Sequence, residues 1–82
     1  MEFDAEALIL RRDTINGVKK KFKFTASSIK EAQDAVIKKL RPKWWQRHRH
    51  LDWVELFQIN PLNGHWFWKN QEWKEIPISH VS

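Results

Sequence analysis

The 82-residue chain contains no cysteine and only two glycines, Gly17 and Gly64. Without cysteine it forms no disulfide and no thiolate metal site, and two distant glycines make no phosphate-binding loop. No segment reaches the roughly 20 apolar residues of a membrane-spanning helix, and residues 1–6 are acidic where a secretory signal is basic. We therefore expect a soluble cytoplasmic protein that does not contact a membrane, and we assign it no cofactor.

Six tryptophans and five phenylalanines supply the core of what we predict to be a single domain over residues 1–82. Residues 1–51 carry thirteen Lys/Arg against six Asp/Glu, a net +7, whereas residues 52–82 carry two against four, a net −2. Every tryptophan lies between positions 44 and 73. The basic and the tryptophan-rich characters therefore overlap only at 44–50.

The first 26 residues predict a hairpin of strands 3–12 and 18–26 around Asn16-Gly17, because this dipeptide favours a two-residue turn. In the second strand the apolar residues Val18, Phe22 and Phe24 alternate with lysines. The two-residue turn would set Arg12 opposite Lys21. One sheet face would then carry a single sign of charge, which requires water or an anionic partner; its members are Arg12, Lys19, Lys21 and Lys23.

A helix is predicted to begin at Ser28-Ile29-Lys30-Glu31, because this sequence is a capping box. Apolar residues at helical spacing continue to Leu40 and form a stripe for burial: Ile29, Ala32, Val36 and Leu40. Pro42 disfavours helical geometry at Arg41, so the helix is expected to end there.

Three further strands are expected at 52–59, 65–69 and 72–78, with loop residues at 60–64 and a two-residue turn at Asn70-Gln71. This turn would pair Lys69 with Glu72 and Trp68 with Trp73, which are favourable cross-strand pairs. The mixed periodicity of 53–59 would also suit a helix.

These elements predict an α+β fold, in which a small antiparallel β-sheet carries one α-helix packed on a face, in the order β-β-α-β-β-β. Residues 41–51 fit no element and are interpreted as a basic and aromatic connection. A structureless connection of this length is usually functional. The alternative is a short second helix within 42–50, begun by Pro42.

This connection is the first candidate site, because no carboxylate occurs between Asp34 and Asp52. Cations interleaved with aromatic rings suit a surface that holds phosphates and stacks on bases. The alternative is a solvated loop in which one tryptophan enters the core. Together with the lysine-rich face, the predicted nucleic-acid or anion-binding set is Arg12, Lys19, Lys21, Lys23, Lys39, Arg41, Lys43, Trp44, Trp45, Arg47 and Arg49.

The tryptophan-rich strands are the second candidate site. Trp66 and Trp68 share one face of their strand and Phe67 lies on the other, so both faces are apolar. This pattern indicates a buried central strand, a ligand groove or a subunit contact. Candidate contacts for a homodimer or another protein are Trp66, Phe67, Trp68 and Trp73.

Metal and catalytic patterns are weak. His48, His50 and Asp52 are spaced for one side of an extended segment, but neighbouring arginines would repel a dication. Asp52 with Glu72-Trp73-Lys74 resembles a fragment of the Asp…Glu-x-Lys arrangement of metal-dependent nucleases, which implies magnesium held by two carboxylates. Only three residues carry this resemblance, and Glu72 already has Lys69 as a predicted partner. We assign no metal ligand and no catalytic residue.

The sequence thus favours a small non-enzymatic module that binds nucleic acid through its basic, tryptophan-containing surface. The alternative is an adaptor or inhibitor, such as a phage or bacterial accessory factor, that docks an acidic protein through its tryptophan-rich sheet. A nuclease is a distant third.

Overall fold

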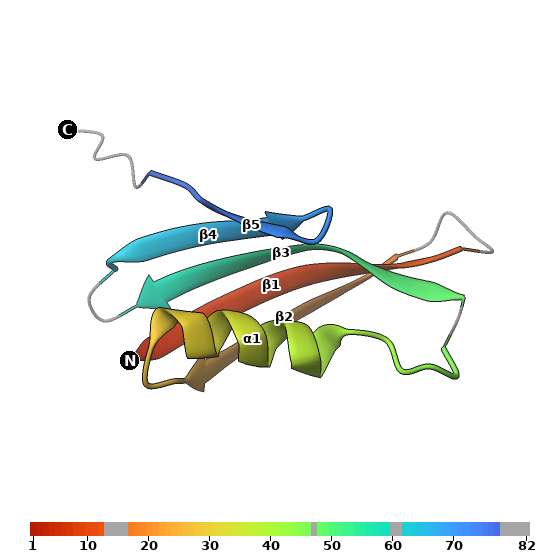
Figure 1. Ribbon diagram of the computed structural model, residues 1–82, viewed down its shortest axis with the longest axis horizontal. Coiled ribbons are helices and arrows are strands. Elements are labelled where there is room, and N and C mark those ends of the chain that lie inside the picture. Colours follow the sequence, from red (N-terminus) through yellow and green to blue (C-terminus); the bar gives the residue numbers. More distant parts are fainter. Residues whose placement is uncertain (13–16, 47, 60–61, 78–82) are drawn as a thin grey trace.

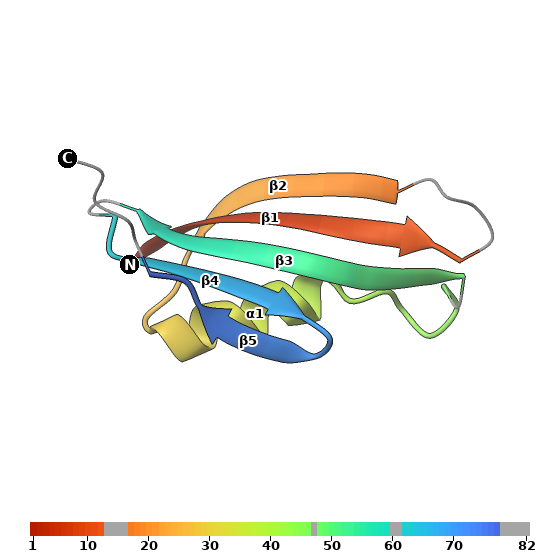
Figure 2. The ribbon, with the colours of Figure 1, turned by 90° about the horizontal axis from the view of Figure 1, so that it is seen from above.

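The computed structural model of the chain describes residues 1–12, 17–46, 48–59 and 62–77. Five strands form one antiparallel sheet in the order β2-β1-β3-β4-β5, and one helix lies across a single face of it (Figures 1 and 2). The elements are β1 (Glu2–Arg11), β2 (Gly17–Thr25), α1 (Ile29–Leu40), β3 (Arg49–Ile59), β4 (Gly64–Lys69) and β5 (Glu72–Glu75). The predicted α+β fold and its β-β-α-β-β-β order are confirmed.

The core lies between the helix and the sheet face that it covers. Alternate residues of each strand point into it, as the period of two requires. The small side chains of Ala5 and Ala7 on β1 let the helix lie close to the sheet. The other buried members are Phe3, Ala32, Val36, Leu40, Leu51, Val54, Leu56, Trp66 and Trp68.

Both ends of α1 form as the sequence predicts. The Glu31 backbone N–H donates to Ser28 Oγ at 3.1 Å, which is the N-cap bond, and Ser27 Oγ donates to the Glu31 carboxylate. At the other end Arg41 is extended, with φ −62° and ψ 127°, directly before Pro42. The helix therefore ends where proline excludes the helical conformation of the residue before it.

The predicted register of the first hairpin is wrong. Gly17 belongs to β2 and pairs with Leu10, so it is a strand residue where the prediction has a turn residue; residues 13–16 lie outside the described residues. The lysines face carboxylates across the strands, with Lys21 opposite Glu6 and Lys23 opposite Asp4. The two registers differ by an even number of residues, so both keep the same side chains in the core. Attraction replaces like-charge repulsion in the observed register.

The connection after α1 is shorter than predicted, because β3 begins at Arg49 and includes His50 and Leu51. The long strand β1 offers the pairing edge: Leu10 pairs with His50 and Arg11 with Arg49, after a register shift between Leu8 and Ile9. Pairing with this edge satisfies backbone groups that a loop would leave to water. The described residues of 42–50 contain turns and strand but no second helix, and 53–59 is strand.

The β4–β5 hairpin has the predicted geometry. Asn70 and Gln71 have φ angles of 54° and 63°, the left-handed values that a two-residue turn of type I′ requires. Lys69 pairs with Glu72, and Trp68 pairs with Trp73. The predicted turn and both predicted pairs are confirmed. The hairpin holds Gln71 and Trp73 beside the end of α1, where both border a cleft.

Gly64 provides a test of the core. It is buried at the start of β4, and a Cβ atom built on it would overlap the indole ring of Trp66. We expect Gly64→Ala to lower the free energy of unfolding by about 1–3 kcal/mol, because the buried ring must shift. Urea unfolding followed by circular dichroism would measure this loss.

The control for this substitution is Leu62→Ala in the preceding loop, where the side chain is 58% exposed. It should change the free energy of unfolding by no more than about 0.5 kcal/mol. Equal effects of the two substitutions would contradict the close packing of Trp66 on Gly64.

Candidate nucleic-acid interface

The connection between α1 and β3 contains a tight turn at Lys43–Gln46. The Gln46 N–H donates to the Lys43 carbonyl at 2.8 Å, and the Lys43 N–H donates to Gln46 Oε1 at 3.0 Å. The Arg49 N–H then donates to the Gln46 carbonyl at 3.0 Å. The backbone is also tied to β1, since the Arg12 N–H donates to the His48 carbonyl at 2.6 Å. These bonds close the turn and join the backbone after it to the residue that follows β1.

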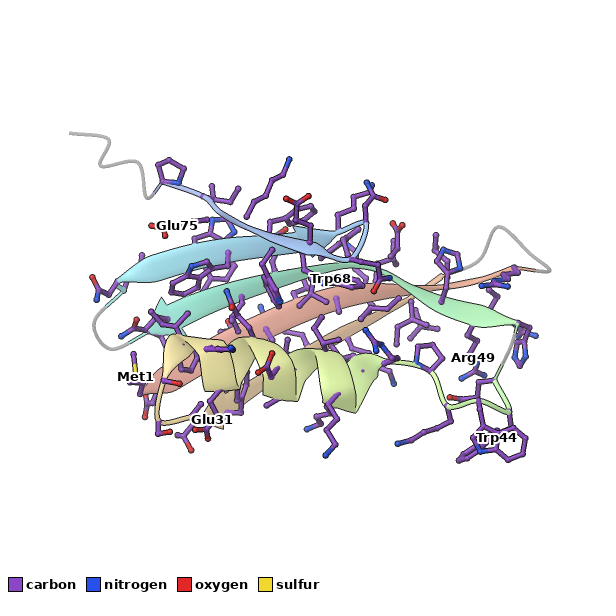
Figure 3. The ribbon with its side chains drawn as sticks, viewed as in Figure 1. Met1, Glu31, Trp44, Arg49, Trp68 and Glu75 are labelled. Atoms are coloured by element: carbon purple, nitrogen blue, oxygen red, sulfur yellow. The ribbon has the colours of Figure 1, made fainter. Side chains whose placement is uncertain are left out.

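Trp44 and Trp45 occupy the two central positions of this turn and are 78% and 62% exposed. Their ring centroids are 5.7 Å apart and their planes meet at 85°, an edge-to-face arrangement. Trp44 extends away from the sheet, below Arg49 in Figure 3. Neither ring enters the core, so the alternative in which one of the pair is buried is wrong.

A cleft separates the end of α1 from the β4–β5 hairpin. It encloses about 500 Å³ between a helix wall and a hairpin wall, and its residues are Asp34, Ile37, Lys38, Arg41, Pro42, Lys43, Trp68, Gln71 and Trp73. Arg41 reaches across it, with Nη2 donating to Gln71 Oε1 at 3.5 Å. Cations from α1 and the connection therefore face an aromatic wall from β4 and β5.

Two smaller hollows extend this cleft along the same side of the molecule. The first, about 320 Å³, shares Arg41 and Lys43 with the cleft and adds Trp44 and Arg49. The second, about 150 Å³, has Arg49 in common with the first and is lined by Ile9, Arg11, Val18, Lys20 and Arg49. Within the described part of the chain, Asp34 is the one carboxylate that lines any of the three. We call these three neighbouring hollows together the basic track.

Three lysine or arginine residues of the basic track are absent from the predicted anion-binding set: Arg11, Lys20 and Lys38. Lys20 shares its strand face with Phe22, so its place on the helix side could be found from the alternation of β2. The sequence did not show, however, that the helix ends before it covers Lys20. Lys38 lies in the last turn of α1, and the helix pattern alone does not show that it borders a cleft. Lys39, by contrast, points to β2, where its Nζ lies 4.3 Å from the Phe22 ring centroid.

The predicted lysine face lies on the other side of the sheet. Phe22 and Phe24 pack against the core, so Lys19, Lys21 and Lys23 alternate onto the uncovered face. The two predicted anion-binding surfaces are therefore separated by the sheet. Of the remaining predicted residues, Arg12 is exposed beside the connection, and Arg47 lies outside the described residues.

The tryptophan-rich candidates divide between the core and the surface. Trp66 and Trp68 are 7% and 4% exposed and belong to the core under α1, and Trp68 also lines the cleft with the little surface that it keeps. Phe67 lies on the uncovered face, where its ring stacks on Trp53 with centroids 6.1 Å apart. Trp73 is half-buried and borders the cleft. Docking of a protein on the uncovered face stays a prediction for Phe67.

The residues of the nuclease resemblance lie on different strands. Asp52 is on β3 and Glu72 on β5, with β4 between them, and Glu72 pairs with Lys69. A separate histidine–carboxylate contact joins His65 Nε2 to Glu55 Oε2 at 3.2 Å on the uncovered face. Among the described residues no three His, Asp or Glu side chains gather as metal ligands. His80 lies outside these residues.

No protein-family model, curated protein or solved structure matches this chain. In the part of the chain that the structure describes, α1 is too short and too polar to cross a membrane. The function must therefore be argued from the basic track itself.

If Trp44 and Trp45 serve binding and not folding, their removal should leave stability nearly unchanged. We expect Trp44→Ala/Trp45→Ala to alter the free energy of unfolding by less than about 1 kcal/mol, because both rings face water. Trp66→Ala, which removes a buried ring, should lower it by about 3–5 kcal/mol. Chemical unfolding of both variants would measure the difference, and a large loss in the double variant would show that the turn is structural.

Proposed function

We propose that this protein binds nucleic acid through the basic track. The observation that carries the proposal is the turn at Lys43–Gln46, which holds two exposed tryptophans between the cations Arg41, Lys43 and Arg49. Phosphates attract these cations, and binding releases the counterions condensed on the nucleic acid. The rings add a contact that bases make and free phosphate does not.

The balance of charge favours the basic track over the lysine face. On the uncovered face Lys21 and Lys23 pair across the strands with Glu6 and Asp4, so a polyanion there would meet carboxylates as well as lysines. The three hollows of the basic track have one lining carboxylate among the described residues, Asp34. A polyanion therefore meets less repulsion on the helix side.

The exposed rings favour nucleic acid over an acidic protein, which the same cations could also attract. Trp44 and Trp45 are held apart from the core by a hydrogen-bonded turn, so their rings are available to a ligand. Every nucleobase presents a flat face that stacks on such rings. Acidic side chains do not.

The test compares two triple variants that remove equal charge from opposite sides of the sheet. Arg41→Gln/Lys43→Gln/Arg49→Gln neutralises the basic track, and Lys19→Gln/Lys21→Gln/Lys23→Gln neutralises the lysine face. Three phosphate contacts predict a log–log salt slope of about −2 on a single strand, or roughly 20-fold weaker binding between about 50 mM and about 200 mM salt. Fluorescence anisotropy of a labelled oligonucleotide would measure the affinity of both variants and its salt dependence.

Only the first triple variant should flatten this salt dependence, while both keep the circular dichroism spectrum of the parent. Loss confined to the second variant would place binding on the lysine face and overturn the proposal. Equal loss in both would mean attraction by net charge without a site. A parent protein that binds no oligonucleotide at low salt would not be a nucleic-acid-binding protein.

A further inference from the structure

We infer that the ligand is single-stranded, with bases stacked at two separate places: on Trp44 and Trp45 at the turn, and on Trp73 inside the cleft. This inference rests on the proposed function and adds the class of nucleic acid and its path. Its basis is the position of the two aromatic stations, which lie at either end of the cations Arg41 and Lys43.

The turn can accept an unpaired base but not a base pair within a duplex. Trp44 and Trp45 meet at 85°, so the pair does not close both faces of each ring, and Trp44 is 78% exposed. Duplex bases are stacked on one another and show only their edges in the grooves. A base in a single strand can turn its flat face to an indole ring. Exposed ring faces therefore favour the single strand.

The cleft has the size and lining for one or a few nucleotides. Its volume of about 500 Å³ lies within the range of pockets that hold small molecules, and a duplex would not enter it. Trp73 is half-buried in its wall. Gln71 from the hairpin and Asp34 from α1 place amide and carboxylate groups on the lining of the cleft, where base edges can form hydrogen bonds.

The segment Arg41–Lys43 joins the two stations, since all three of its residues border both hollows. A strand that spans the stations would carry its phosphates past these two cations. The Arg41–Gln71 hydrogen bond, at 3.5 Å, is at the long limit for such bonds. A phosphate that replaces Gln71 would form a shorter, charge-assisted bond to the guanidinium. Lys38 then faces the next phosphate along the cleft.

The experiment uses three probes of equal length: an oligothymidine strand, a duplex, and an abasic strand that keeps the phosphates without the bases. We expect the oligothymidine strand to bind roughly tenfold more tightly than the other two at near-physiological salt, because stacking adds to phosphate contact. Binding should also quench tryptophan fluorescence with oligothymidine and not with the abasic strand.

Two sets of variants assign this preference to residues. Trp44→Ala/Trp45→Ala should reduce the preference for oligothymidine over the abasic strand and leave the salt slope intact, because it removes rings and no charge. For the cleft, Lys38→Gln should lower the salt slope by about 0.7. The matched control is Lys30→Gln, on the exposed side of the same helix but outside the cleft, and it should leave the slope unchanged. Trp73→Leu, checked for folding by circular dichroism, should weaken oligothymidine binding.

The outcomes distinguish a failure of this inference from a failure of the proposed function. If all three probes bind equally with a steep salt slope, phosphate binding stands and the single-strand inference is overturned. If the Trp44 and Trp45 variant loses the preference but Lys38→Gln and Trp73→Leu behave as the parent, the path through the cleft is overturned. If no probe binds at low salt, both the function and the inference are wrong.

Discussion

The packing of α1 on one face of the sheet is the contact on which the other features depend. The helix covers Ala5, Ala7 and Val54 with its stripe of Ala32, Val36 and Leu40, and burial of these apolar surfaces is the main favourable term in a small domain. Pro42 ends the helix before the strands end (Figure 1). Beyond that point β1, β2 and β3 continue without cover, and the hollow lined by Ile9, Lys20 and Arg49 lies there.

The basic track follows from this early helix end. The connection leaves α1 and enters β3 at Arg49, which pairs with Arg11 on β1. Its hydrogen-bonded turn then projects Trp44 and Trp45 into water, and its flanking cations border a cleft closed on the other side by the β4–β5 hairpin. Side chains from α1, the connection and the β4–β5 hairpin meet here because the sheet order places β4 beside β3 and β5 beside β4. Exposed cations and exposed aromatic rings therefore lie on the same surface, whereas most of the other tryptophans are buried or stacked on another ring.

Prediction from the sequence succeeded where adjacent residues determine the geometry. The cap at Ser28, the helix end before Pro42 and the turn at Asn70-Gln71 each depend on local backbone preferences, and all three form as predicted. The predicted register of the first hairpin was wrong because it was inferred from the turn preference of Asn16-Gly17, whereas Gly17 pairs with Leu10 inside the sheet. Alternation alone cannot distinguish registers that differ by an even number of residues, since they bury the same side chains. The start of β3 was missed because its partner edge on β1 is distant in the sequence.

The sequence by itself therefore determined the fold class, the ends of the helix, and the presence of a basic segment with two adjacent tryptophans. The tertiary structure decided which cations lie together. It placed Lys20 and Lys38 beside Arg41 and Arg49 and put Lys21 and Lys23 behind the sheet among carboxylates. Local propensities act over a few residues, so they can be identified from the sequence one segment at a time. A binding surface depends on which strands become neighbours and on where the helix stops covering them.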